Sequence, residues 1–177
     1  MRPRRCLSLA LILSLPSFAR AQRPEAPAST ASPEVRAWIS GGAGSGTYAY
    51  GSGTGFRLSA GGSYGQTLLM YRGSTAMESL DGYGDSTEWS ILVGRRTAGS
   101  RFYGSAAVGL SRVHWTNGCP TISVCEDGAG TGIAYDFGVH PNARVVGLGV
   151  NLYGVLGSTK ARMTGVALSL ELGWFGR

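Results

Sequence analysis

Apolar and less apolar residues alternate with a period of two along most of the chain beyond residue 34, and no stretch keeps a helical stripe. This alternation is typical of β-strands that have one apolar face each. Eight segments show it, at residues 35–43, 52–62, 65–72, 87–96, 101–113, 132–140, 144–156 and 163–175. The pattern therefore predicts an all-β fold of eight strands.

The last segment, "VALSLELGWF", has the clearest faces. Its apolar face carries Val166, Leu168, Leu170, Leu172 and Trp174, and its other face carries Ala167, Ser169, Glu171 and Gly173. Four further segments have apolar faces made of Phe56, Leu58 and Ala60; Trp89, Ile91 and Val93; Ile133, Tyr135, Phe137 and Val139; and Val146, Leu148, Val150 and Leu152. Leu92 breaks the alternation in its segment. The faces of segments 65–72 and 101–113 stay unassigned.

Composition separates two barrels with this alternation, a soluble one with apolar residues inside and a membrane one with apolar residues outside. The water-facing side of a sheet is normally rich in charged side chains. Here the less apolar faces are mostly Gly, Ser and Ala, and Lys160 is the only lysine among 177 residues. We therefore predict an eight-stranded antiparallel up-and-down transmembrane β-barrel. A secreted soluble barrel that carries an apolar ligand is the alternative.

A few charges lie on the faces that this prediction turns toward the lumen. They are Arg57, Glu88, Arg96, Asp136 and Glu171. An unpaired buried charge is costly, so we expect these side chains to pair with one another. The many glycines, as in "AWISGGAGSGTYAYGSGTG" at 37–55, are then interpreted as space for the larger lumen side chains.

Connections and aromatic residues give the predicted barrel two different ends. The connections at 43–51, 73–86, 114–131 and 157–162 are long, whereas those around "GSYG", "TAGS" and "HPNA" are tight. Outer-membrane barrels have short periplasmic turns and longer outer loops. Aromatic residues near the strand ends predict two interfacial girdles, with Trp38, Phe102 and Trp174 on the inner side and Tyr71, Trp89 and Trp115 on the outer side.

The N-terminal residues predict export. Residues 1–21 have a basic start, an apolar run and Ala19 and Ala21 in A-x-A order, which is typical of a signal peptide. This segment has four arginines and no acid, so its removal lowers the formal net charge from +6 to +2 and leaves no strongly basic surface for nucleic acid. Residues 22–34 predict a flexible periplasmic lead-in, and residues 35–177 the barrel.

On these features the chain resembles the small eight-stranded bacterial outer-membrane barrels of the OmpA/OmpX type, over residues 35–177. The resemblance implies location in the cell outer membrane, contact with outer-membrane lipids and no cofactor. Such barrels end on an aromatic residue read by the outer-membrane assembly machinery, and here Trp174 or Phe175 fills that role. An eight-stranded lumen holds only side chains. We therefore expect a plugged, porin-like barrel that acts as a structural or interaction protein through its outer loops.

The stretch "VHWTNG" at 113–118 gives an enzymatic alternative. It is similar to the His-x-Ser-Asn segment of the outer-membrane lipid A deacylases, in which a histidine activates a serine to attack an ester. The resemblance implies His114 as the base, Thr116 in place of the serine and Glu126 as the orienting carboxylate. The enzyme requires the His114 ring within hydrogen-bonding distance of the Thr116 hydroxyl.

Cysteine and histidine spacing predict little further chemistry. Cys119 and Cys125 form a C-x5-C pair, which in an oxidising compartment predicts a local disulfide, with two free thiols as the alternative. No set of ligands for a metal ion is recognised, because His114 is the only histidine near the cysteines. His140 precedes Pro141 and is expected to be a turn residue.

Overall fold

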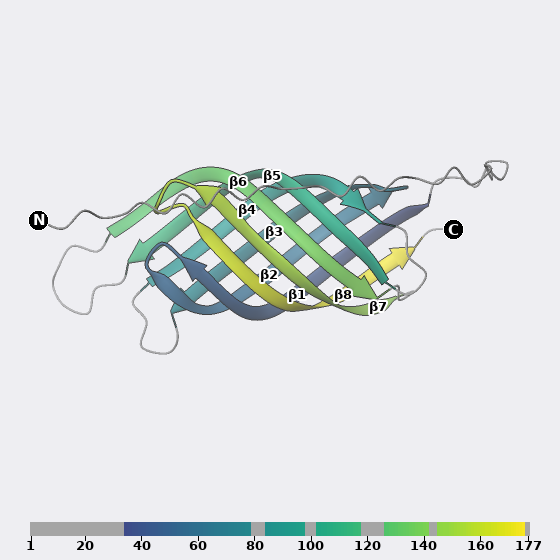
Figure 1. Cartoon of the computed structure of the whole chain (residues 1–177), viewed down its shortest axis with the longest axis horizontal. Helices are drawn as coiled ribbons and strands as arrows, with labels where there is room; N and C mark the ends of the chain where they lie inside the picture. Colours follow the sequence, from purple (N-terminus) through teal and green to yellow (C-terminus); the bar gives the residue numbers. More distant parts are fainter. Residues whose placement is uncertain (1–33, 79–83, 98–101, 118–125, 142–144, 176–177) are drawn as a thin grey trace, which may run out of the picture. The chain divides into compact units, whose positions relative to one another are not determined.

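The protein forms a closed barrel of eight antiparallel strands (Figure 1), in a computed structural model that describes residues 34–78, 84–97, 102–117, 126–141 and 145–175. Each strand pairs with the next along the chain, and β1 pairs with β8 to close the barrel. The strands are β1 (Val35–Tyr48), β2 (Gly51–Tyr64), β3 (Thr67–Glu78), β4 (Gly84–Arg96), β5 (Phe102–Asn117), β6 (Glu126–Pro141), β7 (Val146–Gly157) and β8 (Met163–Phe175). The predicted fold class is confirmed.

Several strands are longer than their apolar patterns indicated. The predicted connection at 43–51 was wrong, because Gly44 to Gly46 pair with β2 on one side and with β8 on the other, and only residues 49–50 connect β1 to β2. Strands β3 and β6 also extend by about six residues at the same end. Main-chain pairing does not need apolar side chains, so these glycine- and serine-rich ends continue the ladders.

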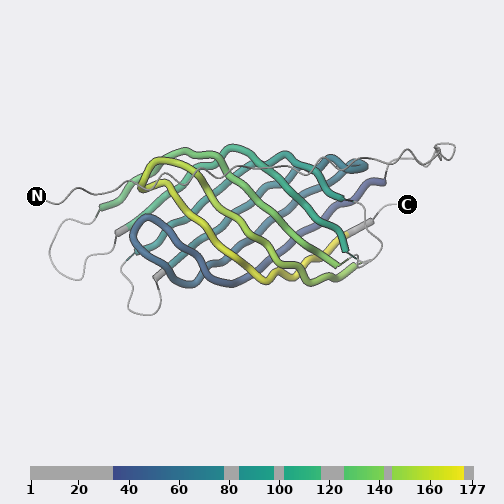
Figure 2. Tube along the Cα trace, viewed as in Figure 1, coloured from purple at the N-terminus to yellow at the C-terminus, as the bar shows by residue number. Residues whose placement is uncertain are grey.

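The two ends of the barrel differ in their connections. We call the loop end the one that carries connections 49–50, 79–83, 118–125 and 158–162, and the terminal end the one that carries 65–66, 97–101 and 142–145 together with Val35 and Phe175. Figure 2 shows the strands inclined to the barrel axis, as closure of a sheet requires. The connections of the loop end are longer on average, but less so than predicted.

The apolar strand faces point outward. Leu168, Leu170 and Leu172 are 60%, 48% and 43% exposed, whereas Glu171 between them is 7% exposed. The outward positions of the other assigned apolar faces are confirmed in the same way, as for Leu58, Ile91, Ile133 and Leu148. An apolar exterior and a polar interior invert the arrangement of a soluble barrel. Hydrocarbon is therefore the solvent that fits this outer surface, and the soluble alternative is wrong.

The interior also contains apolar clusters that the pattern did not reveal. Leu92, which broke the alternation, packs inside with Leu68 and Met70. Trp115 is buried with Val113 and Val155, so its predicted place in the outer girdle was wrong. Trp38 packs against the Leu92 cluster instead of joining an inner girdle. The side chain of Trp174 lies outside the part of the structure that is described.

Glycines make room for the large interior side chains. Tyr153 is completely buried, and a Cβ placed on Gly55 or Gly165 would lie 2.7 and 2.6 Å from atoms of its ring and hydroxyl. Glycine is the residue that permits such close approach. Over the described residues, no helix is long and apolar enough to cross a membrane.

Candidate functional site

Arg72 on β3 crosses the middle of the lumen. Its Nη2 and Nε donate to the two carboxylate oxygens of Glu88 on β4, at 2.7 and 3.2 Å. Its guanidinium also donates to the carbonyl oxygens of Tyr135 and Gly154, at 2.6 and 3.1 Å, and to Asp136 Oδ2 at 3.2 Å. These five bonds match the five N–H donors of a guanidinium. The buried cation is therefore fully satisfied and connects β3 to β4, β6 and β7.

Asp136 on β6 joins Arg72 to a second arginine. Arg57 on β2 donates from Nε to Asp136 Oδ2 at 2.9 Å and from Nη1 to Ser40 Oγ at 3.1 Å. Asn151 on β7 donates to Asp136 Oδ1 at 3.2 Å. We call Arg57, Arg72, Glu88 and Asp136 the central network. Its two cations and two carboxylates balance, which is the condition for burying them together.

A second polar cluster lies nearer the terminal end, where its members come from β4, β5, β6 and β8. The Tyr103 hydroxyl donates to Glu171, with distances of 2.7 and 2.8 Å to the two oxygens. The His140 Nδ1 lies 3.0 Å from Glu171 Oε2, and its ring stacks on Tyr103. The guanidinium carbon of Arg96 lies over the Tyr103 ring, 5.0 Å from the ring centroid. His140 belongs to β6 and is 6% exposed, so its prediction as a turn residue was wrong.

The five charges expected in the lumen divide between these two groups. Arg57, Glu88 and Asp136 belong to the central network, whereas Glu171 and Arg96 contact Tyr103. The sequence did not identify Arg72, the partner of Glu88. A signal was present, because Arg72 alternates with Met70 and Ser74 while Leu69 and Tyr71 form the more apolar face of that segment.

Little open space separates the two polar groups. The cavity between them has a volume of about 20 Å³ and is bordered by Arg57, Asp136 and Asn151 on one side and by His140 and Glu171 on the other. This volume suits about one water molecule.

Three side chains meet at the loop end. Lys160, between β7 and β8, donates to Glu126 on β6, and the Tyr50 hydroxyl donates to the same carboxylate at 3.1 Å. The hydrogen bonds from Lys160 and Tyr50 lower the pKa of Glu126, and the bond to Glu126 raises the pKa of Lys160. Because its pKa is lower in the folded state, the Glu126 carboxylate stabilises the folded state at pH values above 4.5, the ordinary pKa of the group. This contribution to stability is lost as the pH falls through the folded-state pKa.

Glu126→Gln is expected to accelerate acylation of Lys160 by an amine-reactive ester at pH 8. The substitution removes the carboxylate that raises the pKa of Lys160, so a larger fraction of the amine is neutral and nucleophilic. Peptide mass spectrometry of the purified barrel measures the rate. Asp127→Asn removes a neighbouring exposed carboxylate as the control and leaves the rate unchanged. Equal rates in Glu126→Gln and in the unchanged protein contradict the prediction.

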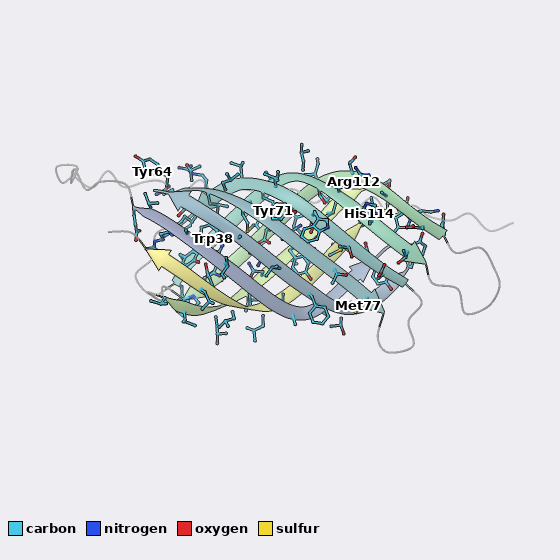
Figure 3. The ribbon with its side chains drawn as sticks, turned by 180° about the vertical axis from the view of Figure 1, so that it is seen from behind. Trp38, Tyr64, Tyr71, Met77, Arg112 and His114 are labelled. Atoms are coloured by element: carbon cyan, nitrogen blue, oxygen red, sulfur yellow. The ribbon has the colours of Figure 1, made fainter. Side chains whose placement is uncertain are left out.

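The residues of the enzymatic alternative share one face of the barrel but are not joined. His114 and Thr116 both point outward from β5, near the loop end (His114 in Figure 3). The Thr116 hydroxyl donates to Asp85, and within the described residues no hydrogen bond connects it to His114. Glu126 is bound by Lys160 and Tyr50. The three residues therefore do not form a base, nucleophile and orienting carboxylate in contact.

Cys119 and Cys125 lie outside the described residues, and their disulfide stays a prediction. Within the described ranges, no three His, Cys, Asp or Glu side chains gather as a metal site would require.

Comparison with solved structures places this architecture among bacterial outer-membrane barrels. Ail, the attachment invasion locus protein of Yersinia pestis, in complex with the heparin analogue sucrose octasulfate, matches 80% of this chain and 99% of its own at 14% identity and a TM-score of 0.58. The N-terminal β-barrel domain of Pseudomonas aeruginosa OprF matches 78% of this chain and 97% of its own, at 13% identity and 0.59. The Neisserial surface protein A (NspA) matches 78% of this chain and 96% of its own, at 16% identity and a TM-score of 0.52.

No protein-family model matches the sequence, and no curated protein matches it. The structural likeness at this identity shows the fold, which is that of a small outer-membrane β-barrel, as the sequence predicted. It agrees with the apolar exterior and supports the predicted location in the cell outer membrane.

Proposed function

We propose that this protein is a plugged outer-membrane β-barrel that acts as a structural or interaction protein through its loop end, which faces the cell exterior. The observation that carries the proposal is the central network, because Arg72 spans the lumen with every donor satisfied by protein atoms. A channel needs a continuous path of water through the lumen. The paired charges of the central network occupy the middle of the lumen, which argues against such a path.

The apolar clusters strengthen the proposed plug. Tyr153, Met163 and Tyr48 pack together inside the barrel, as do Val113 and Trp115. An eight-stranded barrel has an interior only wide enough for side chains. Closure by two kinds of contact, charged and apolar, favours a structural or interaction role over diffusion of solutes.

The charge of the loop end favours a basic partner. Among the described side chains, the strand ends and connections there carry Asp85, Glu126 and Asp127, against Lys160 and Arg162. Electrostatic complementarity favours partners of opposite sign. Ail was solved with a polyanionic heparin analogue. An excess of carboxylates repels such a ligand, so we propose a different partner class for this chain.

The exported parts of the chain belong to the same proposal. Residues 1–21 serve as signal peptide and residues 22–34 as periplasmic lead-in, and Trp174 or Phe175 presents the terminal aromatic to the assembly machinery. A lipid A deacylase activity with His114 and Thr116 is the weaker alternative, because the Thr116 hydroxyl is directed at Asp85.

Planar-bilayer recording tests the plug. The refolded barrel is expected to give no stable ohmic steps at neutral pH, under conditions in which a sixteen-stranded porin, the positive control, conducts. Regular conductance steps that scale with protein concentration would overturn the proposal.

A membrane-impermeant amine reagent applied to intact cells tests the orientation, because Lys160 is the only lysine and lies at the loop end. Its modification is expected only if the loop end is outside.

A further inference from the structure

Two arginines face the lumen at the terminal end of the barrel. Arg36 lies at the start of β1 and Arg96 at the end of β4, and both have inward parity, since their neighbours Val35 and Arg95 are exposed on the outside. The side chains of Arg36 and Arg96 are 11% and 9% exposed, and both border the lumen cavity. These two charges are therefore directed at the opening of the barrel, whereas Arg95 is directed at its surroundings.

Both arginines contact one carboxylate, that of the residue before β1. Glu34 Oε1 lies 2.7 Å from Arg36 Nη2, and Glu34 Oε2 lies 3.9 Å from Arg96 Nη2. The main chain of Glu34 is held as well, because its carbonyl oxygen accepts from the Gly65 N–H, at 2.9 Å, in the turn between β2 and β3. We call Arg36, Arg96 and the Gly65 N–H the terminal clamp. It contacts the carboxylate and the carbonyl of a single peptide residue.

Glu34 uses only part of the terminal clamp. A guanidinium has five N–H donors, but within the described residues the Arg96 side chain donates no hydrogen bond. Its contacts are the 3.9 Å ion pair and the Tyr103 ring, whose centroid lies 5.0 Å from the guanidinium carbon. The Glu34 side chain is 49% exposed, and an ion pair with an exposed partner contributes little to stability. Glu34 is therefore a weakly held occupant, and Arg96 retains donors for a better placed carboxylate.

From these contacts we propose that the terminal clamp binds an acidic peptide segment of a periplasmic partner protein, which takes the place of Glu34. One carboxylate of the segment accepts hydrogen bonds from Arg36 and Arg96, and the carbonyl of the same residue accepts from the Gly65 N–H. The planar fork of arginine matches a carboxylate in a bidentate manner. A lipid phosphate has no adjacent amide carbonyl to occupy the third contact. The periplasmic place of the partner rests on the proposed function, because the terminal end faces the periplasm only if the loop end faces outside.

Fluorescence anisotropy with the purified full-length barrel in detergent tests the clamp. The probe is a dye-labelled, C-terminally amidated peptide of residues 31–35, Ala-Ser-Pro-Glu-Val. Arg96→Gln is expected to weaken binding of the probe about 10-fold, the loss of one charge-assisted contact. Glu34→Gln is expected to strengthen it by up to about 5-fold, because the resident carboxylate no longer competes. Arg95→Gln removes the neighbouring outward cation as the matched control and leaves binding unchanged.

A second peptide, with Gln in place of its Glu, is expected to bind all of these proteins equally weakly. Heat-modifiable migration on a gel verifies that each variant is folded. Three outcomes overturn the proposal: Glu34→Gln does not strengthen binding, Arg95→Gln weakens it as much as Arg96→Gln, or a soluble peptidoglycan fragment binds more tightly than the peptide. The second outcome would mean diffuse attraction to a basic rim, and the third a cell-wall ligand.

Binding in detergent depends neither on orientation nor on closure of the lumen, so the two proposals fail separately. A barrel that conducts contradicts the plug and leaves the anisotropy results to decide the clamp. If Lys160 is not modified from outside, the proposed orientation and the periplasmic place of the partner are both wrong. Loss of the difference between Arg96→Gln and Arg95→Gln removes the clamp even where the plug and the orientation are confirmed.

Discussion

Arg72→Met is expected to lower the free energy of unfolding by about 3–5 kcal/mol, the cost of breaking a buried ion pair by removing one partner. The substitution leaves the Glu88 carboxylate fully buried with Ser74 as its remaining hydrogen-bond donor among the described residues. Asp136 retains Arg57 and Asn151. The loss therefore arises mainly at Glu88. Urea titration of the barrel in lipid vesicles, followed by tryptophan fluorescence, measures it.

The second partner distinguishes a charge effect from a packing effect. If the uncompensated carboxylate causes the loss, the double variant Arg72→Met, Glu88→Gln is more stable than the sum of the two single variants indicates. Arg95→Met is the control, since Arg95 is exposed at the terminal end and donates to Gln66. We expect it to change the free energy of unfolding by less than about 0.5 kcal/mol. Additive losses in the double variant contradict the assigned role of the pair.

The lipid-facing surface was predictable because it follows from the alternation of apolar residues along each strand. In β8 every second residue is a large apolar one, and the pleat alone sends these residues to one side of the sheet. The scarcity of charge on the other face then indicated that the apolar face meets hydrocarbon and that the other face lines the lumen. Arg57 and Asp136 were found in the lumen by the same parity. Strand number and faces thus follow from neighbours in the sequence.

The partners inside the lumen were less accessible from the sequence. Arg72 and Asp136 are 64 residues apart and meet only because the barrel closes and brings β3 opposite β6. No local pattern specifies that meeting. His140 was misplaced for a related reason: Pro141 suggested a turn, but β6 continues to this residue, and the ring is held by Tyr103 and Glu171 from other strands.

Trp115 shows how parity can overrule position. An aromatic residue near a strand end is expected at the membrane interface. On β5, however, Val113 and Trp115 share the inward parity, while Arg112 and His114 point outward. Space for the indole comes from the neighbouring strand, because a Cβ on Gly128 would lie 2.6 Å from it. The parity of β5 thus turns this tryptophan inward, and the glycine on β6 leaves room for its ring.

The same steric argument predicts a large effect at Gly109 on β5. An added Cβ would lie 1.8 Å from the carbonyl oxygen of Ile91 and 2.7 Å from the Leu92 Cα, both in the main chain of β4. A side chain can rotate away from such a contact, but a paired strand cannot move without losing ladder hydrogen bonds. We expect Gly109→Ala to cost more than the about 1–3 kcal/mol of ordinary overpacking and to reduce the yield of folded barrel.

Gly41→Ala is the matched control on β1, where the new Cβ meets only the Leu58 Cδ1, at 3.8 Å. That distance is an ordinary contact, and replacing glycine by alanine also reduces the entropy of the unfolded chain, so stability is expected to stay the same or rise by up to about 1 kcal/mol. Refolding yield on a gel and urea midpoints compare the two variants. Equal midpoints for Gly109→Ala and Gly41→Ala would mean that β4 and β5 do not approach as closely as described. A lower urea midpoint for Gly109→Ala alone would show that this glycine permits the close approach of β4 and β5. Its role then differs from that of the glycines that make room for lumen side chains.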